Sequence, residues 1–551
     1  MASVMIEEAL NVAYTYLSQR YAKKELIKLC KALNIIAGVE DYQYKKSNLL
    51  TVCSYENVQS ILSDMNEKES IRKTKGVYYT PSDVVKFMLY NSIKAANNKL
   101  KTTNLHVLDL NGVSYRTICT KKSVFDPTCG AGVFLLAALN IKFDLLDANS
   151  PNITSVMIKK VIATIHGNDV NPESTTITKI RLYLCTLHRY GVTKIEGIEE
   201  VLNCSFDNYD FVQDASSRNE KYDIVIGNPP YVEDSKSGLN PAKKYGNIYA
   251  NVLKNSAEML ADGGVFAFII PLSYVSTPRM QTIRDDLFDI VPEQYILSYS
   301  DRPDCLFTSV HQKLCILLSV KKDCPKTVYT SNYRYWYKDN RNELFTSTEV
   351  IKNEFAETDY IPKLGTEYDK TIYRKIMAMN NNPSLYDMND GGEGHLFVNM
   401  RAAFWIKAFL GEHTGSEYKH YQYQDRNQAN YAMCLYNSSL FWWYWICISD
   451  CWHITKKELT GFHVPVIQDF AAVNRLAELL ETQLENTKVY VGTKQVEYEY
   501  KHKDCVEVIH EIDDYINGLF GLTDAESVYI KNFAYRFRIG GGAEGDENES
   551  D

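Results

Sequence analysis

The hydrophobic pattern between Gly76 and about Val320 alternates between two kinds of segment. Short apolar runs such as KSVFDP and YDIVIG are followed by longer amphipathic stretches such as VFLLAALNIKFDLL and NIYANVLKNSAEML. Short apolar runs indicate buried strands, and longer amphipathic stretches indicate helices. The regular alternation of the two predicts an α/β fold, a doubly wound and mainly parallel sheet with helices on both faces.

One strand and helix unit of this pattern lies in residues 247–270. Apolar side chains such as Ile248 and Val252 fall on one face of a helix over 247–260. We expect the glycines at 263 and 264 to end this helix and to separate it from a buried strand at 265–270.

The segments on either side of this region have different compositions. Residues 1–70 show helical apolar spacing and no recognisable chemistry, and all six tryptophans lie after residue 326, where the strand and helix rhythm stops. The predicted organisation is an N-terminal helical segment (1–70), an α/β domain (71–325), an aromatic-rich domain (326–480), a C-terminal helical segment (481–540) and a disordered acidic tail (541–551).

The composition is that of a folded protein with more than one domain. The 551 residues exceed the size of a typical domain, and the hydrophobic and charged fractions of 45% and 23% are ordinary for globular proteins. A formal net charge of −9 disfavours a nucleic-acid partner. Acids in the tail contribute more than half of that charge, however, so its sign decides little.

Neither a membrane segment nor a metal site is predicted. The N-terminal residues carry glutamates where a signal peptide would be basic, and the most apolar runs are shorter than the roughly 18 residues of a membrane span. The 13 cysteines include no C-x-x-C pair, and we expect Cys447 and Cys451, one helical turn apart, to be buried apolar residues. A cytoplasmic protein without a metal is therefore expected.

A glycine-rich turn follows an acid at the end of a predicted strand in SVFDPTCGAGVF. Gly130 and Gly132 allow the backbone to approach a ligand, and the N–H groups that open the next helix point toward it. Such a loop is also found in ordinary turns between a strand and a helix. Asp126, which ends the strand, is the adjacent candidate binding residue.

A second acid, Asp169, ends the strand in TIHGNDVNP. An acid at the tip of the second strand of a doubly wound sheet is the position that binds a ribose diol. It lies 43 residues after Asp126, and the first loop is not G-x-G-x-x-G. Both features disfavour a nicotinamide enzyme.

The segment YDIVIGNPPYV contains the most informative motif. Two prolines end the strand because neither can donate to the ladder. The Asn228 side-chain oxygen and the Pro229 carbonyl can each accept one N–H of a planar amine, and Tyr231 can stack on the attached ring. Accepting both hydrogens directs the lone pair of the nitrogen, which suits an in-line methyl transfer.

Taken together, the motifs of residues 71–322 resemble gamma-class, TaqI-like adenine-N6 DNA methyltransferases. The matching pieces occur in the order of that family: GVYYTP, DPTCGAG, GNDVNP, GNPPY, IIPLSYVS and CLFTSV. A weaker similarity covers NSSLFWWYWICISDCWHITKKELTGFHVP. The resemblance implies a Rossmann-like methyltransferase sheet, followed by a C-terminal aromatic-rich target-recognition domain with flanking helices.

The resemblance also implies roles for individual residues. The motif Asn228, Pro229, Pro230 and Tyr231 would hold the target adenine, with Phe307 on its other face. Tyr79 and Thr80 would contact the methionine end of S-adenosylmethionine, and Asp169 its ribose. The remaining cofactor positions are Asp126, Pro127, Gly130, Gly132, Ser205 and Phe206.

One segment departs from the family pattern. The family has an acid followed by an aromatic residue that binds the adenine amine of the cofactor. In NCSFDNYDF, Ser205-Phe206 takes this place without the acid, and Asp207 lies two residues after the position where the acid is required. The acid that would bind the adenine amine of the cofactor is therefore missing from this position.

The implied function is transfer of a methyl group from S-adenosylmethionine to N6 of a flipped adenine in duplex DNA, as an orphan or restriction-modification methylase. Expected partners are double-stranded DNA and a restriction endonuclease, in a bacterial-type cytoplasm where DNA associates the protein with the nucleoid. Two alternatives stay open. In the first, the chain is the modification subunit of a larger restriction complex with a separate specificity subunit. In the second, it is a protein-glutamine N-methyltransferase, which also uses NPPY.

A DNA enzyme needs cations along the path of the phosphates. Lys243 and Lys244, after NPPY, are the expected substrate-binding cations. We expect Trp442, Trp443 and Trp445 to form domain core rather than a surface that stacks on bases. Further candidate cations are Arg72, Lys73, Lys75, Lys321, Lys322, Lys326, Lys456 and Lys457.

Overall fold

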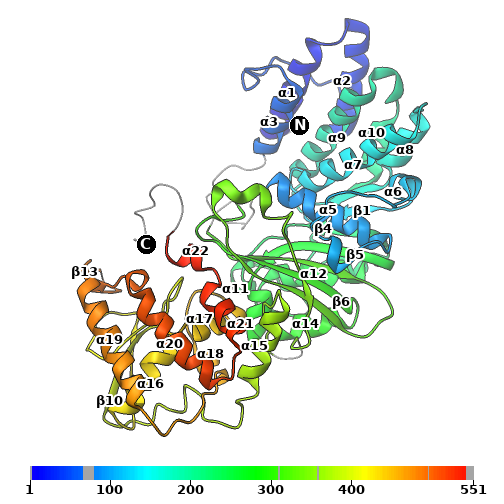
Figure 1. Cartoon of the computed structure of the whole chain (residues 1–551). Coiled ribbons are helices and arrows are strands. Elements are labelled where there is room, and N and C mark those ends of the chain that lie inside the picture. Colours follow the sequence, from blue (N-terminus) through cyan, green and yellow to red (C-terminus); the bar gives the residue numbers. More distant parts are fainter. Residues whose placement is uncertain (1–2, 66–79, 308–310, 357–358, 494, 541–551) are drawn as a thin grey trace.

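The computed structural model describes residues 3–65, 80–307, 311–356, 359–493 and 495–540. It has helices at the N-terminal end, a large sheet in the middle and a second mixed unit at the C-terminal end (Figure 1). Within the described ranges, no helix is both long enough and apolar enough to span a bilayer.

The central sheet has nine strands in the order β3-β2-β1-β4-β5-β7-β6-β8-β9. The first five strands of this order pair in parallel, and β7 runs antiparallel to both β5 and β6. The predicted α/β doubly wound fold is confirmed. The strands are β1 (Val124–Asp126), β2 (Ile165–Asn168), β3 (Phe206–Asp207), β4 (Tyr222–Gly227), β5 (Leu260–Pro271), β6 (Glu293–Tyr299), β7 (Leu314–Val320), β8 (Thr327–Arg334) and β9 (Ile351–Lys352).

Strand direction places the ends of several strands on one edge of the sheet. β1, β4, β5 and β6 all run the same way, so their carboxyl ends meet there. β7 runs the opposite way, so it begins at this edge. Ligands of open α/β sheets bind at the carboxyl ends of the strands. This edge is therefore where the site is expected.

Alternating side chains of the strands pack against helices on the two faces of the sheet. Val225 and Phe266 share one core cluster with α12 (Ile248–Glu258) and α14 (Gln281–Phe288). Ile224 and Val265, their neighbours along the strands, belong to a second cluster with the helices of the opposite face. Those helices are α5 (Ser82–Ala96), α7 (Val133–Asn149) and α9 (Pro172–Tyr190).

The glycines at 263 and 264 do not end a helix, contrary to the sequence prediction. They lie inside β5, which already begins at Leu260, and the register with β4 shifts between Tyr222 and Ile224. Gly263 has a φ of +70°, and a Cβ on Gly264 would lie 2.7 Å from the Ala261 carbonyl oxygen. The glycines therefore form an irregularity in the strand that a larger residue would disrupt.

The N-terminal helices join the core of the second face. α1 (Val4–Ser18), α2 (Lys23–Ala37) and α3 (Tyr55–Met65) pack on α9, and their buried residues belong to the same cluster as those of α7. Shorter α-helices before residue 353 are α6 (Tyr115–Thr120), α8 (Ser155–Ile162), α10 (Ile198–Cys204), α11 (Asp234–Ser237) and α13 (Ser273–Ser276).

We call residues 353–540 the C-terminal half. It combines the small antiparallel sheet β11-β10-β12 with helices, and its core cluster is continuous with the first face of the main sheet. Its strands are β10 (Gly394–Asn399), β11 (Lys407–Phe409), β12 (Tyr418–Tyr423), β13 (Val489–Tyr490) and β14 (Tyr498–Glu499). Its helices are α15 (Glu367–Met377), α16 (Arg426–Asn437), α17 (Ser439–Ile448), α18 (Lys456–Gly461), α19 (Ala471–Thr487), α20 (Val506–Leu519), α21 (Asp524–Asn532) and α22 (Tyr535–Arg538).

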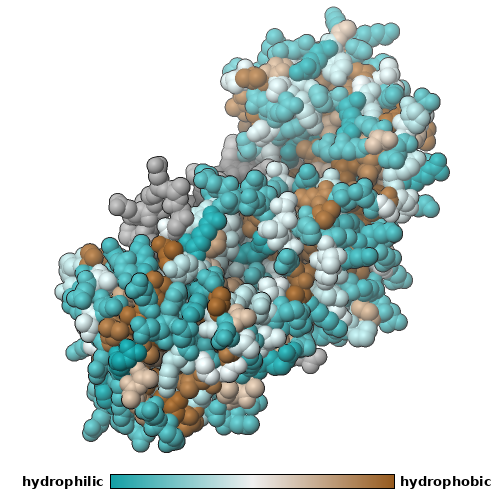
Figure 2. Space-filling model, in the orientation of Figure 1, coloured by the Kyte–Doolittle hydropathy of each residue, from teal (hydrophilic) through white to brown (hydrophobic). Residues whose placement is uncertain are grey.

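Two sequence predictions concern the C-terminal half, namely its tryptophan core and its boundaries. Trp442, Trp443 and Trp445 on α17 are at most 1% exposed, so they form core. The domain boundaries stay a prediction, but β8 and β9 belong to the main sheet, and α19 runs across residue 480. The surface in the view of Figure 2 is mainly hydrophilic, with apolar residues in small scattered groups.

Candidate active site

The Asn228 carboxamide is held at the carboxyl end of β4. Its Nδ2 donates to the Thr80 hydroxyl at 3.2 Å, and its Oδ1 lies 2.6 Å from the Tyr231 hydroxyl. Both partners are hydroxyl groups, which can donate as well as accept, and together they hold the amide in place. The end of GVYYTP and the start of NPPY, far apart in sequence, therefore meet here.

Tyr231 connects this motif to the next strand. Its hydroxyl lies 2.8 Å from the Ile269 carbonyl oxygen of β5 as well as near Asn228, so its single proton has two acceptors. The ring is partly exposed and stands edge-on to Tyr249, with centroids 6.4 Å apart. Pro229 is buried and Pro230 is partly exposed. Stacking of Tyr231 on a base stays a prediction.

The glycine-rich loop adopts a conformation that other residues rarely take. Gly130 and Gly132 have φ angles of +50° and +74°. A Cβ on Gly132 would lie 2.3 Å from the Thr178 side chain on α9. Both glycines are thus required, by backbone conformation and, at Gly132, by the close approach of α9.

Asp169 holds the same loop through its carboxylate. Oδ2 accepts the Gly130 N–H at 2.9 Å, and Oδ1 accepts the Asn171 N–H, also at 2.9 Å. Both N–H groups donate to the carboxylate, which ties the tip of β2 to the glycine loop. The structure therefore brings Asp169 and the glycine loop together, as the sequence predicted, while binding of a ribose stays a prediction.

Asp126 lies buried between this loop and the catalytic strand. Burial raises the pKa of its carboxyl well above the ordinary value, and nearby Asp169 adds to this, while the Thr128 N–H opposes it. A Cβ on Gly227 would lie 2.7 Å from Asp126 Oδ1, so only glycine fits before Asn228. Asp126 thus joins the glycine-rich loop to the NPPY motif.

Asn168, a residue to which the sequence pattern did not point, closes the site on the side of β2. Its Nδ2 donates to the carbonyl oxygens of Pro127 and Tyr209 at 3.0 and 3.1 Å, and its Oδ1 accepts the Tyr209 N–H. Asn168 therefore joins the glycine loop to the segment after β3. The GNDVNP motif contained the residue but gave no sign of this role.

The Ser205-Phe206 pair lies in packed positions. The Ser205 hydroxyl donates to the Val201 carbonyl oxygen of α10, and Phe206 packs against Gly167. Five residues later, the same segment contains Asp210 followed by Phe211, which is the acid and aromatic pair that the resemblance requires. Because Tyr209 is fixed to Asn168, Asp210 lies next to the end of β2.

Phe307 is 1% exposed and lies in a segment tied to α5. The Arg341 guanidinium donates to the carbonyl oxygens of Cys305 and Leu306 and forms an ion pair with Asp83 in the first turn of α5. α5 begins two residues after Thr80, so this network connects Phe307 to the site. Its contact with a flipped base stays a prediction, and Tyr79 lies outside the described residues.

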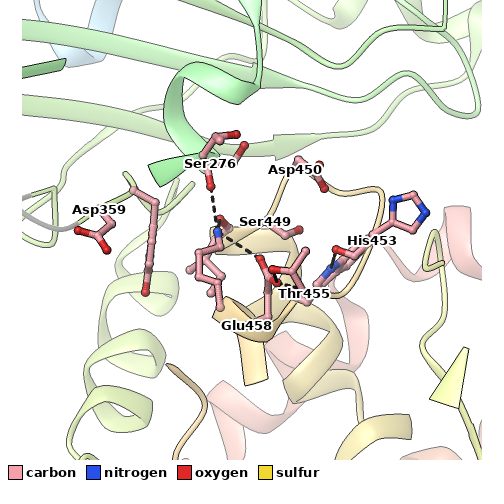
Figure 3. Close-up of polar contacts among 12 residues, drawn as sticks. Ser276, Asp359, Ser449, Asp450, His453, Thr455 and Glu458 are labelled. Carbon is pink, nitrogen blue, oxygen red and sulfur yellow. Dashed lines mark hydrogen bonds and ion pairs between the residues drawn. The ribbon is translucent and has the colours of Figure 1, made fainter. Parts of the chain in front are cut away.

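The expected cations differ in their surroundings. Lys243 pairs with Asp286 at 2.5 Å, whereas Lys244 is exposed. Lys321 and Lys322 follow β7 and therefore lie at the opposite edge of the sheet from Asn228. Lys456 and Lys326 lie over the rings of Tyr386 and Phe288, respectively. Lys457 donates to the Ser276 carbonyl oxygen in the network of Figure 3. Arg72, Lys73 and Lys75 lie outside the described residues.

The central segment of the chain matches a known family. Residues 163–300 match the model described as Eco57I restriction-modification methylase. Asp169, Asp210 and the whole NPPY motif lie within this match, as do Lys243 and Lys244. The match covers a quarter of the 551-residue chain.

Two curated relatives are similar over part of their length. The chain is 27% identical over 205 residues to Type II methyltransferase M.BstVI of Geobacillus stearothermophilus, covering 35% of this chain and 36% of that protein. It is 22% identical over 208 residues to adenine-specific methyltransferase PglX of Streptomyces coelicolor, covering 31% of this chain and 16% of that protein. The chain thus aligns with much less than two thirds of either relative.

One solved structure resembles nearly the whole chain. The Type IIL restriction-modification enzyme MmeI, solved in complex with DNA, aligns with a TM-score of 0.53 and 11% identity over 97% of this chain and 98% of that chain. At this identity the likeness concerns the fold. It extends the agreement beyond the methyltransferase sheet to the C-terminal half.

Proposed function

We propose that the chain is a DNA methyltransferase that transfers a methyl group from S-adenosylmethionine to N6 of adenine in duplex DNA. The observation that carries this proposal is the oriented Asn228 carboxamide at the end of β4, with Thr80 on its nitrogen and Tyr231 on its oxygen. The names of the matched family and relatives favour the same enzyme class. The finer assignment to the gamma, TaqI-like class rests on the motif order alone.

The residues around the glycine loop fit S-adenosylmethionine. The Thr128 hydroxyl is buried without a hydrogen-bond partner among the described residues, and the Asp169 carboxylate holds the Gly130 N–H of the loop. When bound, the cofactor supplies an electrophilic methyl group. Asp169 would hold its ribose, and Thr80 its methionine end. Asp210 would accept a hydrogen bond from the adenine amine of the cofactor, which is the role of the acid that is missing at Ser205-Phe206.

The target amine would be oriented by NPPY. Asn228 Oδ1 and the Pro229 carbonyl would each accept one amine hydrogen, which directs the nitrogen lone pair along the line of transfer. A methylated amine that still carries its second proton is acidic, so the proton can leave to water after transfer. Positioning supplies most of the rate. Reaching this pocket requires flipping the adenine, at an unpairing cost of a few kcal/mol.

Two other functions compete with the leading proposal. As a modification subunit, the chain would need a separate specificity subunit to read DNA. As a protein-glutamine N-methyltransferase, it would use the same NPPY geometry on a primary amide. The extensive C-terminal half favours DNA, because an enzyme that methylates a glutamine has no need for a second unit of this size.

The test is incorporation of labelled methyl groups by the purified chain into genomic DNA and, in parallel, into a protein lysate. We expect N6-methyladenine within one short sequence, and loss of the label in Asn228→Ala. Label in protein glutamine alone would contradict the proposal. Methylation only after addition of a second subunit would establish the modification-subunit alternative. Sequencing of the host genome for modified adenines would identify the site and show whether a restriction endonuclease accompanies the enzyme.

A further inference from the structure

The N-terminal helices reach the glycine loop through a buried pair of side chains. Gln59 on α3 and Arg181 on α9 are 7% and 6% exposed, and the two helices pack side by side (Figure 1). Arg181 Nε donates to Gln59 Oε1 at 3.0 Å, and Gln59 Nε2 donates to the Arg181 backbone oxygen at 3.1 Å. One partner is only a donor and the other only an acceptor, so the Gln59 amide is held in a single orientation.

The outer end of the Arg181 guanidinium contacts the glycine loop. Its Nη1 donates to the carbonyl oxygen of Ala131, the residue between Gly130 and Gly132. One turn earlier on α9, the Thr178 hydroxyl donates to the Gly130 carbonyl oxygen at 2.8 Å. Two side chains of α9 therefore hold two successive carbonyl oxygens of the loop.

These contacts matter because glycines leave the loop free to adopt other shapes. Glycine reaches the φ angles of +50° and +74° at Gly130 and Gly132 at low cost, but it reaches many other conformations as easily. In a trans peptide the N–H points opposite to the carbonyl oxygen, so the bond from Thr178 directs the Ala131 N–H away from α9. A peptide that turned over would present an oxygen where a bound ligand meets an N–H. Holding the carbonyl oxygens thus fixes the surface that the loop offers to a cofactor.

Arg181 can hold the loop only if its own long side chain is fixed. A guanidinium group is planar and rigid, so a partner on one nitrogen sets the direction of the others. Gln59 binds Nε, the inner nitrogen, while Nη1 is directed at Ala131. A change at Gln59 should therefore be transmitted to the loop, although Gln59 lies on another helix.

We propose that Gln59 is a positioning residue of the cofactor site. It orients Arg181, and Arg181 holds the loop around Ala131 in the conformation that binds S-adenosylmethionine. The inference rests on the proposed function, and it gives the N-terminal helices, whose sequence shows no recognisable chemistry, a part in cofactor binding. Gln59 should therefore act on the affinity for the cofactor and not on the methyl-transfer step.

The test compares four variants of the full chain. Gln59→Met keeps the length of the side chain and removes both polar atoms, whereas Gln59→Glu keeps an oxygen acceptor for Arg181 Nε. Arg181→Met removes the donor to Ala131, and it is also combined with Gln59→Met in a double variant. Leu62→Ala is the matched control, because Leu62 is buried on the same helix and its truncation weakens the packing of α3 while the Gln59–Arg181 pair stays.

Three properties are measured under conditions in which the variants are folded. Calorimetry gives the affinity for S-adenosylmethionine, and methyl-transfer kinetics separate kcat from the Michaelis constant for the cofactor. Hydrogen exchange of residues 128–135 without cofactor reports on the loop itself.

We expect Gln59→Met to bind the cofactor about tenfold more weakly, as loss of one hydrogen bond to a charged group would cause. Its kcat at saturating cofactor should stay within about twofold of the parent, and its loop should exchange faster. Gln59→Glu should bind the cofactor more tightly than Gln59→Met, and Leu62→Ala should keep the parent affinity. The double variant should bind no more weakly than Arg181→Met alone, because Gln59 acts through Arg181.

Three results would overturn the inference and leave the proposed function standing. The first is a parent affinity and parent loop exchange in Gln59→Met. The second is an equal loss of affinity in Gln59→Met and Leu62→Ala, which would show that α3 only supports the fold. The third is a further loss when Gln59→Met is added to Arg181→Met. A parent chain that does not bind S-adenosylmethionine would overturn the proposed function together with this inference.

Discussion

The ammonium group of Lys457 lies 2.9 Å from the backbone oxygen of Ser276, and this contact joins the two halves of the protein. Ser276 ends α13, which follows β5 of the catalytic sheet, and Lys457 is in the first turn of α18. The same ammonium donates to the Ile448 carbonyl oxygen at 2.6 Å and pairs with Glu458 at 3.1 Å. Figure 3 shows Ser276 at the top of the network and Glu458 below it.

Lys457→Met should destabilise the protein by about 2–3 kcal/mol, because two carbonyl oxygens and the buried Glu458 lose a charged donor. Burial lowers the pKa of Lys457, and Glu458 opposes the shift. Urea unfolding measures the change. Lys456→Met is the control, since Lys456 is exposed and contacts only the Tyr386 ring at 4.5 Å among the interactions described. Its loss should cost about 0.5–1 kcal/mol. Equal effects of the two variants would show that the contact with Ser276 is not important.

Asn228→Ala should abolish methylation, by at least about 100-fold, while cofactor affinity changes little, because the carboxamide faces the target amine. Calorimetric titration with S-adenosylmethionine and a methyl-transfer assay measure the two properties. Asn219→Ala, on the exposed loop before β4, is the matched control. If Asn228→Ala loses cofactor affinity to the same extent as activity, Asn228 belongs to the cofactor site instead.

Asp169→Asn should weaken cofactor binding at least about tenfold, because a carboxylate that accepts hydroxyl hydrogens is worth roughly 1.5–3 kcal/mol. The amide keeps one oxygen for the backbone, so the loop conformation is preserved in part. The Michaelis constant for the cofactor and the melting temperature are measured together. Asp207→Asn, at the exposed end of β3, is the control. An unchanged Michaelis constant would argue against the ribose role.

The candidate site was predictable from sequence because its signals are local. A glycine pair with positive φ, an acid at a strand tip and two prolines after a strand each reveal their role within a few residues. Asp126, Gly130 and Asn228 accordingly lie where the motifs placed them. At Ser205-Phe206 the local signal is incomplete, because the acid of the family pattern is missing there and the pair Asp210-Phe211 lies five residues later.

The features that escaped prediction depend on contacts between distant segments. The irregularity at Gly263 arises from the pairing of β5 with β4, and β8 joins the main sheet through β6. Likewise, Lys457 resembles any surface lysine in sequence and becomes buried only because Ser276 lies against it. Periodicity carries no information on such long-range partners.

His502 should make the stability of the C-terminal half sensitive to acid. It is 1% exposed, and burial lowers its pKa to about 3, with Lys407 and Arg538 acting in the same direction. The unfolded chain takes up a proton near pH 6.5 and the folded chain does not. Stability is therefore present above pH 6.5 and is lost as the pH falls toward 3, by about 2 kcal/mol between neutral pH and pH 5.

Urea unfolding of His502→Gln at pH 7 and pH 5 measures this contribution. The difference between the two pH values should be about 2 kcal/mol smaller than in the parent, whatever the variant costs at neutral pH. His395→Gln, on the exposed face of β10, leaves His502 in place and should keep the parent difference. An identical pH dependence in parent and His502→Gln would show that His502 is protonated in the folded protein.

DNA specificity should reside in the C-terminal half. Asn228 and its neighbours can select adenine by its amine, but flanking base pairs must be read by side chains in the grooves. The sequence pattern predicts that residues 326–480 read these flanking base pairs. A graft that begins at residue 326 would remove β8 and β9 from the main sheet, however, and one that ends at residue 480 would cut α19 in the middle.

The exchange should therefore extend from residue 353 to residue 540, so that α19, α20 and α21 move together with α16 and α17, on which they pack. We expect a chimera that carries this region of a related enzyme to methylate the target sequence of the donor, because the grafted side chains select the DNA while Asn228 performs the same reaction. Sequencing for N6-methyladenine identifies the modified sites. A folded, active chimera that still methylates the original sequence would place the reading of DNA in the catalytic half or in a separate subunit.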